Sequence, residues 1–456
     1  MTADSGPGGE AELAEQLADA LRDKVGPAVR VTGLTRLPGG ASRETWAFDA
    51  VSADGSRAEL VLRRDPPGRP SEPGAMSREA RSMTAARAAG LAAPEVLAWT
   101  DEPGLWGMAG LVMRRVPGET IARRILRDDA YRSARGVLVR QAGEFAARLH
   151  ALEPGAGLPA PDPLADLREA LGTLRKDLAQ ASEVFDLALT ALEASPPPAR
   201  GPAMVHGDFR LGNFIVGPES LRAVIDWELV HSGNPAEDLG WLCVKAWRFG
   251  VDAPVAGLGS REDLVAAYRA AGGADIGLDE LWWWELLGTL RWGVICMSQA
   301  WAHLSGAHRS VELAAIGRRV CEQEWDLLLL LAPQAAAAAA AARPRLAGAP
   351  LAAPAPFGRP TASELLDAVR GFLAEQVMPD TSGPLAFHAR VAANVLGIVA
   401  RELELGSPPG PVSPSAERGR SADWPDLAAQ VAARLAVANP RYFETTPLPA
   451  QGREKG

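Results

Sequence analysis

The chain has 456 residues, of which 47% are apolar and 23% are charged. This composition excludes general disorder and a membrane bundle, and the length predicts two or three domains. The formal net charge of −9 argues against a nucleic-acid partner.

The cysteines and the N-terminus indicate where the protein resides. Three cysteines far apart in the chain make neither a disulfide framework nor a metal-ligand spacing. The N-terminal segment lacks a basic stretch followed by an apolar run, and the longest leucine run, residues 327–331, is too short to cross a bilayer. We therefore expect a cytoplasmic protein with no membrane partner.

The N-terminal part predicts a helix followed by a sheet. Residues 9–24 carry apolar side chains at helical spacing, within an N-terminal segment that spans residues 1–29. Short β-type runs separated by Gly and Pro follow to about residue 113, and they predict an antiparallel sheet of about five strands. One predicted helix, roughly 77–89, interrupts this sheet. Together these elements form a β-rich N-lobe over residues 30–115.

A helical lobe is predicted over residues 116–332, because most of its segments have helical period and length. The exceptions are two short β-rich runs flanked by turn residues, VHGDFRLGNFIV and RAVIDWEL. They predict a small hairpin region inside the helical lobe. The overall fold class is therefore α+β and bilobal.

The C-terminal part begins with low-complexity Ala/Pro sequence. Residues 333–358 have too few large apolar side chains to form a core, so we interpret them as a linker. Beyond it, Glu364 stands three residues after Thr361, as in a capping box that starts a helix. Two more amphipathic stretches follow. They predict a small α-helical domain over residues 359–445, with no catalytic constellation in it.

The two β-rich runs carry the residues that phosphoryl transfer needs. Such a reaction uses a carboxylate that orients and deprotonates the attacking hydroxyl, and oxygen ligands that hold Mg²⁺ against the nucleotide phosphates. Asp208 is the candidate base, while Asn213 and Asp226 are the candidate metal ligands. The alternative is that HGD is a structural turn and IDWE the end of a strand, since Asp, Gly and Asn are common in turns. The joint pattern favours the functional interpretation.

HGDFRLGN and IDWE resemble the signature of the aminoglycoside phosphotransferase family, which includes choline kinases. The resemblance covers about residues 30–330. It implies a protein-kinase-like fold, ATP or GTP as co-substrate, Mg²⁺, and a small-molecule hydroxyl acceptor. VMRRVPGETI and RWGVICMSQA resemble, more narrowly, the branch related to the phosphotransferase domain fused to some acyl-CoA dehydrogenases.

This resemblance assigns a nucleotide loop to LPGGASRETW, with Gly39, Gly40 and Ser42 at its centre. Missing side chains let backbone N–H groups approach phosphate oxygens. A Gly-Gly hairpin turn is the alternative, and the position ahead of the downstream motif favours the loop.

In kinases a cation on the third strand holds the α and β phosphates and pairs with a helix glutamate. The strand LVLRR offers Arg63 for this role, and Arg64 if the register differs. Glu79 in the following helix is the expected partner, the alternative being a solvated helix charge. Arg in place of Lys still binds phosphate, through a planar fork.

The resemblance also assigns supporting residues. Met113 lies in the strand and hinge that would contact the base through backbone groups. His206 would brace the catalytic loop, and Asp238 would steady it, unless Asp238 is only a helix N-terminal carboxylate. Arg291, beside the tryptophans at 282–284, is a candidate substrate contact.

The predicted function is a small-molecule kinase, with a hydroxyacyl-CoA favoured as acceptor over an aminoglycoside. Candidate cations for an acyl-CoA are Arg210, Lys245, Arg248 and Arg291. The alternatives are an aminoglycoside phosphotransferase and a non-catalytic nucleotide-binding module that docks a partner through its C-terminal helices. Those helices are also a candidate surface for homo-oligomer formation. A protein kinase is disfavoured because no Asp-Phe-Gly or Ala-Pro-Glu sequence follows the HGD loop.

Overall fold

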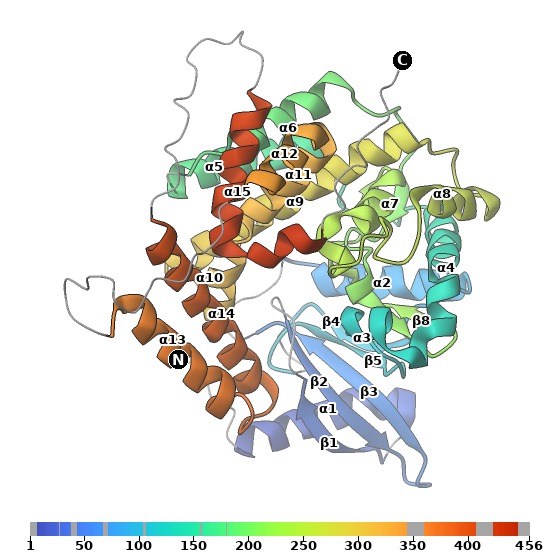
Figure 1. Ribbon diagram of the computed structural model, residues 1–456. Helices are drawn as coiled ribbons and strands as arrows, with labels where there is room; N and C mark the ends of the chain where they lie inside the picture. Colours follow the sequence, from blue (N-terminus) through green and yellow to red (C-terminus); the bar gives the residue numbers. More distant parts are fainter. Residues whose placement is uncertain are drawn as a thin grey trace. The chain divides into compact units, whose positions relative to one another are not determined.

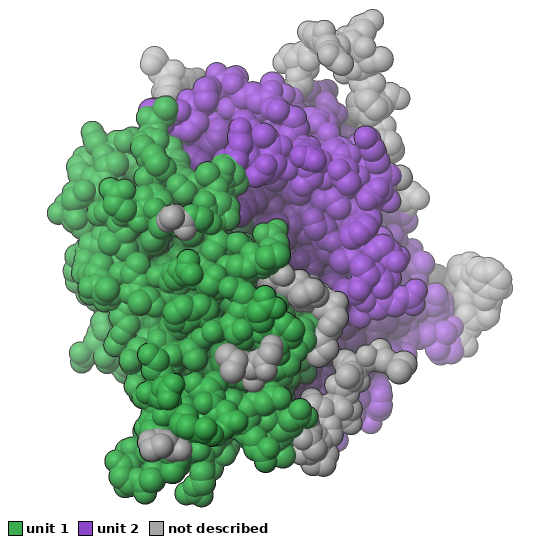
Figure 2. All heavy atoms as spheres, turned by 180° about the vertical axis from the view of Figure 1, so that it is seen from behind, with its two compact units in different colours: residues 1–161, 199–243, 253–281 green, residues 162–198, 244–252, 282–456 purple. Residues whose placement is uncertain are grey.

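The computed structural model describes residues 7–26, 28–37, 43–66, 72–103, 106–155, 157–178, 180–343, 360–406 and 423–445. The chain divides into two compact units (Figure 2). The first unit contains residues 1–161, 199–243 and 253–281, and the second contains residues 162–198, 244–252 and 282–456. The predicted lobe boundary at residue 115 does not separate these units, because the first unit includes both the N-terminal sheet and residues 199–243, which contain the two β-rich runs.

The first unit opens with helix α1 (Pro7–Val25) and a five-stranded sheet (Figure 1). The strands are β1 (Arg30–Arg36), β2 (Glu44–Val51), β3 (Arg57–Arg64), β4 (Val96–Thr100) and β5 (Gly110–Arg114). Their order is β1-β2-β3-β5-β4, and every neighbouring pair is antiparallel. The predicted sheet of about five strands is confirmed.

The two faces of β3 serve different purposes. Leu60 and Leu62 are fully buried in a core that includes Leu17 of α1, and burial of each such side chain contributes roughly 1.5–3 kcal/mol. Arg63 directly follows Leu62, and because side chains alternate along a strand it faces the opposite side of the sheet. On that side helix α2 (Ala75–Ala88) packs against β4 and β5.

The rest of the first unit is helical apart from two short two-stranded sheets. Its helices are α3 (Ala122–Arg127), η1 (Asp129–Tyr131), α4 (Arg132–His150), α7 (Ala236–Cys243) and α8 (Arg261–Ala270). One sheet pairs β6 (Ala203–Val205) with β9 (His231–Gly233), which are far apart in the chain, and the other is a hairpin of β7 (Phe214–Val216) and β8 (Leu221–Val224). Single turns η2 (Leu211–Asn213) and η3 (Trp227–Leu229) flank them. This matches the predicted hairpin region inside helical sequence.

The second unit is built from helices. They are α5 (Pro163–Leu178), α6 (Glu183–Ala194), η4 (Lys245–Arg248), most of α9 (Leu278–Leu304), α10 (Val311–Gly317), α11 (Val320–Leu331), α12 (Pro333–Ala342), α13 (Ala362–Phe372), η5 (Leu373–Val377), α14 (Gly383–Leu405), α15 (Trp424–Ala438) and η6 (Pro440–Thr445). The α+β class, with an N-terminal sheet and a helical C-terminal part, is confirmed.

The predicted linker is wrong at its start, because residues 333–342 form helix α12. Ala has the highest helix propensity, and Pro333 occupies a first-turn position where its missing N–H has no cost. Ala336 and Ala340 are buried, and the helix packs against α15. Small side chains here allow close helix packing, so a buried face forms without large apolar residues.

The three C-terminal helices are present, and α13 starts with the predicted capping box between Thr361 and Glu364. They do not form a compact unit of their own. Helix α15 packs against α11 and α12, and α14 packs against α10. The predicted separate domain over residues 359–445 is therefore part of the second unit.

Helices α13 and α14 expose much apolar surface. They carry seven of the thirteen large apolar side chains that are exposed among the described residues. Helix α14 also has the length and mean hydropathy, 1.3, of a membrane span, with 11% of that window buried. A single such helix among the described residues is weak evidence for a span, because other apolar helices pass the same test.

Candidate active site

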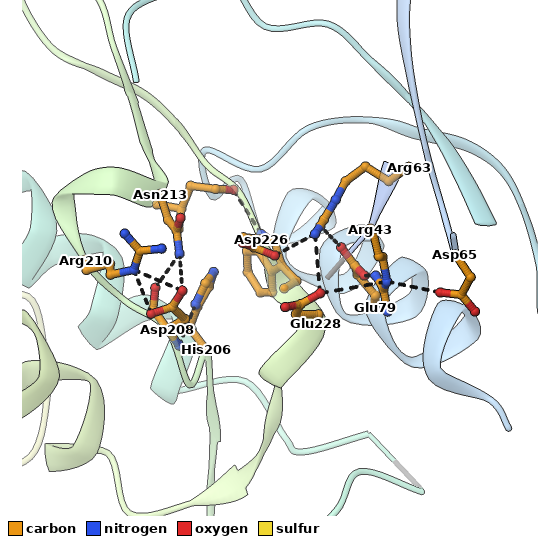
Figure 3. Close-up of polar contacts among 12 residues, drawn as sticks. Arg43, Arg63, Asp65, Glu79, His206, Asp208, Arg210, Asn213, Asp226 and Glu228 are labelled. Carbon is orange, nitrogen blue, oxygen red and sulfur yellow. Dashed lines mark hydrogen bonds and ion pairs between the residues drawn. The ribbon is translucent and has the colours of Figure 1, made fainter. Parts of the chain in front are cut away.

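The β7–β8 hairpin brings two predicted metal ligands together. Phe214 pairs with Val224, so Asn213, just before β7, lies beside the residues that follow β8. The Ile225 N–H donates to the Asn213 carbonyl at 2.9 Å, directly before Asp226. Figure 3 shows both side chains in one region, near Asp208.

The HGD turn requires its glycine. Gly207 has a φ of +81°, and a Cβ there would lie 2.4 Å from the carbonyl oxygen of Leu229. The close approach arises because β6 pairs with β9, which places Val205 opposite His231. Any side chain at position 207 would push these strands apart and displace Asp208.

Asp208 is fixed by several donors. Its Oδ2 accepts a 2.7 Å hydrogen bond from Asn213 Nδ2, and its Oδ1 accepts one of 2.7 Å from Trp241 Nε1. Arg210 Nε lies 2.9 and 3.1 Å from the two carboxylate oxygens. These contacts orient the carboxylate in the way that a base or a proton-accepting group needs. Arg210 is thus an Asp208 partner, whereas the sequence suggested an acceptor contact.

Asp238 and His206 support the loop that carries Asp208. Asp238 accepts hydrogen bonds from the backbone N–H groups of His206, at 2.8 Å, and Gly207, at 3.0 Å, and it contacts His150 Nε2 at 3.1 Å. Burial opposes ionisation of Asp238, but the hydrogen bond to His150 and the nearby charges bring its pKa below the usual value. The structure therefore places Asp238 where it was expected to steady the loop.

His206 is held as a neutral ring. Burial lowers its pKa despite the surrounding carboxylates. Its Nδ1 accepts a 3.2 Å hydrogen bond from the backbone N–H of Asp208. The ring packs against Phe209 and Trp227. This geometry suits the bracing role that the sequence assigned to it.

Arg63 links the sheet, helix α2 and Asp226. Its guanidinium donates to Glu79 at 2.6 Å and to Asp226 at 2.7 Å. Arg64 pairs instead with Glu44 at 3.0 Å, so Arg63 occupies the register of the phosphate-binding cation. Burial opposes the charge of Arg63, but Glu79 and Asp226 raise its pKa. Burial alone would raise the pKa of the Asp226 carboxyl. The positive charge of Arg63 outweighs this effect and holds that pKa below its usual value.

Asp226 adopts a strained backbone conformation, with φ 69° and ψ 61°. A non-glycine residue in the left-handed region costs about 1–3 kcal/mol and persists where the surroundings enforce it, often at a functional site. Helix α2 packs against η3, which starts at the next residue. The turn thereby presents the Asp226 carboxylate to Arg63.

The donor set fits Mg²⁺. Asn213 donates from Nδ2, which leaves its carbonyl Oδ1 as a ligand atom, and Asp226 supplies a carboxylate. Within the described ranges, no group of three or more His, Cys, Asp or Glu residues could hold a metal. Two protein oxygens, completed by water and phosphate oxygens, are a typical Mg²⁺ environment in nucleotide enzymes.

Two charged residues of the site carried no assigned role in the sequence. Arg43 has a nearly buried side chain and pairs with Glu79, with Asp65 at 3.6 Å and with Glu228 at 3.8 Å. Glu228 also lies 3.5 Å from Arg63. Their positions are a usable signal, since Arg43 lies within LPGGASRETW, the predicted nucleotide loop, and Glu228 ends the IDWE motif. Trp241 offered no such signal.

The residues predicted to contact the nucleotide base, the phosphate loop and the acceptor lie in different parts of the chain. Met113 is buried on β5 opposite Val61, and Gly39, Gly40 and Ser42 lie outside the described residues. Arg291 is partly buried on α9 in the second unit.

Two of the proposed acyl-CoA cations are engaged within the second unit. Lys245 Nζ lies 3.1 Å from Asp326, and Arg248 lies 2.8 Å from Glu285. Both carboxylates are almost fully buried, so each cation serves first to neutralise a buried charge.

Comparison with known protein families identifies the family of this chain. Residues 33–278, more than half of the chain, match the phosphotransferase enzyme family. The chain belongs to this family. The phosphotransferase assignment made from HGDFRLGN and IDWE is therefore confirmed, as is the enzyme class. Residues 379–418 match a domain of unknown function, DUF6285.

Individual relatives agree with the narrower branch. The phosphotransferase is 31% identical over 207 residues to acyl-CoA dehydrogenase family member 11 of Gallus gallus, which covers 40% of this chain and 24% of that protein. It is 28% identical over 209 residues to family member 10 of Mus musculus, covering 41% of this chain and 18% of that protein. The chain thus spans a quarter or less of the length of these relatives.

A solved structure shares the fold. It is a candidate aminoglycoside phosphotransferase from Ralstonia eutropha JMP134, with a TM-score of 0.53 and 20% identity, covering 69% of this chain and 97% of that one. At this identity the match shows the kinase-like fold of the phosphotransferase alone.

Proposed function

We propose that this phosphotransferase transfers the γ-phosphoryl group of Mg·ATP or Mg·GTP to a hydroxyl group of a small metabolite. The observation that carries the proposal is the convergence of Asp208, Asn213 and Asp226. Arg63 adds to it by bridging Asp226 to Glu79. A protein that only bound nucleotide would have no need for a carboxylate fixed by three donors at the position of Asp208.

Each residue then has one task. Asp208 accepts the hydroxyl proton as the acceptor oxygen bonds to the γ-phosphorus and the bond to the β-phosphate oxygen breaks. Asn213 Oδ1 and the Asp226 carboxylate would hold Mg²⁺, which neutralises phosphate charge. Arg63 stays on Glu79 and turns its second amino group from Asp226 to the α and β phosphates.

The nucleotide would be bound by groups that recognise phosphate and base. Backbone N–H groups around Gly39, Gly40 and Ser42 would contact the phosphates. The backbone of β5 near Met113 would contact the base, which leaves ATP and GTP as alternatives. Mg²⁺ and a cytoplasmic location complete the proposal.

A hydroxylated acyl-CoA is the proposed acceptor class. The support is that the related sequences are named as acyl-CoA dehydrogenase family members. Arg291 is the proposed contact for its phosphates. The likeness to a candidate aminoglycoside phosphotransferase does not favour an aminoglycoside, because at 20% identity it concerns the fold.

A panel of alcohols tests the function. Nucleoside diphosphate release is measured with hydroxyacyl-CoAs, aminoglycosides and simple alcohols, each with Mg²⁺ and with EDTA. We expect Mg²⁺-dependent release above the no-acceptor background for a hydroxyacyl-CoA. Release with aminoglycosides alone would replace the acceptor class. Nucleotide binding without transfer to any acceptor would favour the non-catalytic module.

Self-association through α13 is a second part of the proposal. Leu365, Val369 and Phe372 follow i, i+4, i+7 spacing, and each side chain is at least half exposed. We expect light scattering to show an oligomer for the full chain and a monomer for Val369→Glu. Leu304→Glu, at an exposed leucine on α9, is the matched control and should remain oligomeric. A monomeric wild-type chain at micromolar concentration would contradict this part.

A further inference from the structure

A cavity of about 250 Å³ lies in the first unit, and none of the residues assigned to metal or phosphate lines it. It is bounded by the end of β3, the start of α2 and the connection between β4 and β5. Its lining includes three carboxylates, Asp65, Glu72 and Asp101, together with Met76 and Met108. None of the described residues that line it is a lysine, arginine or histidine.

The lining suits a small organic cation. A cavity of about 150 Å³ accommodates a benzene molecule, so the space here takes one ring with a short arm. Methionine side chains make favourable contacts with aromatic rings. Within the described residues no three carboxylates come close enough to hold a metal ion. The Glu72 side chain is 86% exposed and lies 3.6 Å from Arg78, so Asp65 and Asp101 contribute more of the negative charge that the space meets. An ammonium group on an apolar body matches this arrangement better than a bare cation.

A continuous series of ion pairs joins the cavity to the metal site. Asp65 is 1% exposed and lies 3.6 Å from Arg43, and Arg43 pairs in turn with Glu79. Glu79 holds Arg63, which contacts Asp226 (Figure 3). The series is largely buried, so its charges are poorly screened by solvent.

Helix α2 provides a second connection. Met76 lines the cavity, and Glu79 is one turn further along the same helix face. A molecule that contacts Met76 therefore acts on the element that positions the partner of Arg63.

We propose that this cavity is an effector site for a small organic ammonium ion, and that its occupancy weakens Mg·nucleotide binding. The second of these claims, that occupancy weakens Mg·nucleotide binding, rests on the proposed function of Asp226 as a metal ligand. A cation beside Asp65 competes with Arg43 for this carboxylate and repels its guanidinium. Arg43 then shifts toward Glu228, which lies 3.5 Å from Arg63. Added positive charge near Asp226 disfavours a metal ion there.

Calorimetry with the full-length protein tests binding without turnover. The probes are 2-phenylethylamine, which is charged at neutral pH, and 2-phenylethanol, its neutral counterpart of similar size. We expect the amine to bind at least about tenfold more tightly than the alcohol. With a saturating Mg²⁺-loaded, non-hydrolysable ATP analogue, amine affinity should fall at least about fivefold, and nucleotide affinity should fall reciprocally.

Two neighbouring carboxylates give matched variants. Asp101 lines the cavity and accepts a 3.1 Å hydrogen bond from the Ser77 N–H, a bond that Asp101→Asn can keep. Glu102 is exposed and does not belong to the lining. Asp101→Asn should weaken amine binding about three- to fivefold, whereas Glu102→Gln should leave it unchanged.

The outcomes separate the two claims. Equal affinity for amine and alcohol, or an unaffected Asp101→Asn variant, would overturn the effector site. Tight amine binding with unchanged nucleotide affinity would overturn the coupling. Failure of the protein to bind Mg·nucleotide at all would refute the proposed function, while the amine titration would still decide the site.

Discussion

Asp208→Asn is expected to lower turnover about 10²–10⁴-fold while Mg·nucleotide affinity stays within about twofold. Asparagine has nearly the same shape, but it cannot take the hydroxyl proton, and its amide cannot accept from Asn213, Trp241 and Arg210 together. Transfer is measured as single-turnover loss of the γ-phosphoryl group, and affinity is measured by calorimetry.

The control for this variant is Asp23→Asn, which makes the same chemical change at an exposed position on α1. It should behave as the wild-type protein in both measurements. Turnover that survives in Asp208→Asn would remove this residue from the mechanism. Equal loss of turnover and of nucleotide affinity would instead assign it to binding.

Asp226→Ala should weaken binding of the Mg²⁺-loaded nucleotide by more than about 100-fold, because the loss of a residue that merely supports a metal ligand already costs about 10–100-fold. In this variant the nucleotide should also bind with the same affinity in the presence of Mg²⁺ and in the presence of EDTA. The physical reason is that Asp226 is the only carboxylate among the two proposed protein ligands. Calorimetry with a non-hydrolysable analogue gives both quantities.

A second variant separates metal loss from misfolding. Asp226 sits at φ 69°, a conformation that asparagine tolerates far better than alanine. Asp226→Asn should therefore fold with less strain and still lose most of the Mg²⁺ dependence, because a neutral oxygen replaces a charged one. Thermal unfolding of both variants shows how much of the alanine effect is structural. Normal Mg²⁺-dependent affinity in Asp226→Asn would mean that another group holds the metal.

The alternation of strand residues made much of the nucleotide lobe predictable. Leu60 and Leu62 define one buried face of β3, so Arg63 had to face α2, where Glu79 was expected. Arg64 remained an alternative because sequence alone does not show where the pleat ends. The observed pairing of Arg64 with Glu44 separates the two.

The wider charge network could not be predicted, because it depends on tertiary contacts. Arg43 and Asp65 are 22 residues apart in the chain and meet only because β2 and β3 are paired and α2 packs nearby. Likewise, Trp241 reaches Asp208 from helix α7, 33 positions away. Neither contact has a spacing rule that a single sequence reveals.

In the C-terminal part the helices are predictable from the sequence, but their packing is not. Its helices were read correctly from their caps and apolar spacing, as at Thr361 and Glu364. Their association with the second unit is not predictable in the same way, because the alanine-rich segment before them has the composition of a linker. Buried Ala336 and Ala340 show that small residues can form a packing face as well as a flexible stretch.

A crystal structure with Mg²⁺ and a non-hydrolysable ATP analogue tests the central claim most directly. The account predicts Mg²⁺ at about 2.1 Å from Asn213 Oδ1 and an Asp226 carboxylate oxygen, with Arg63 turned from Asp226 to the phosphates and Asp208 facing the γ-phosphate. A metal held by other residues, or a nucleotide bound while Arg63 keeps its contact with Asp226, would contradict it.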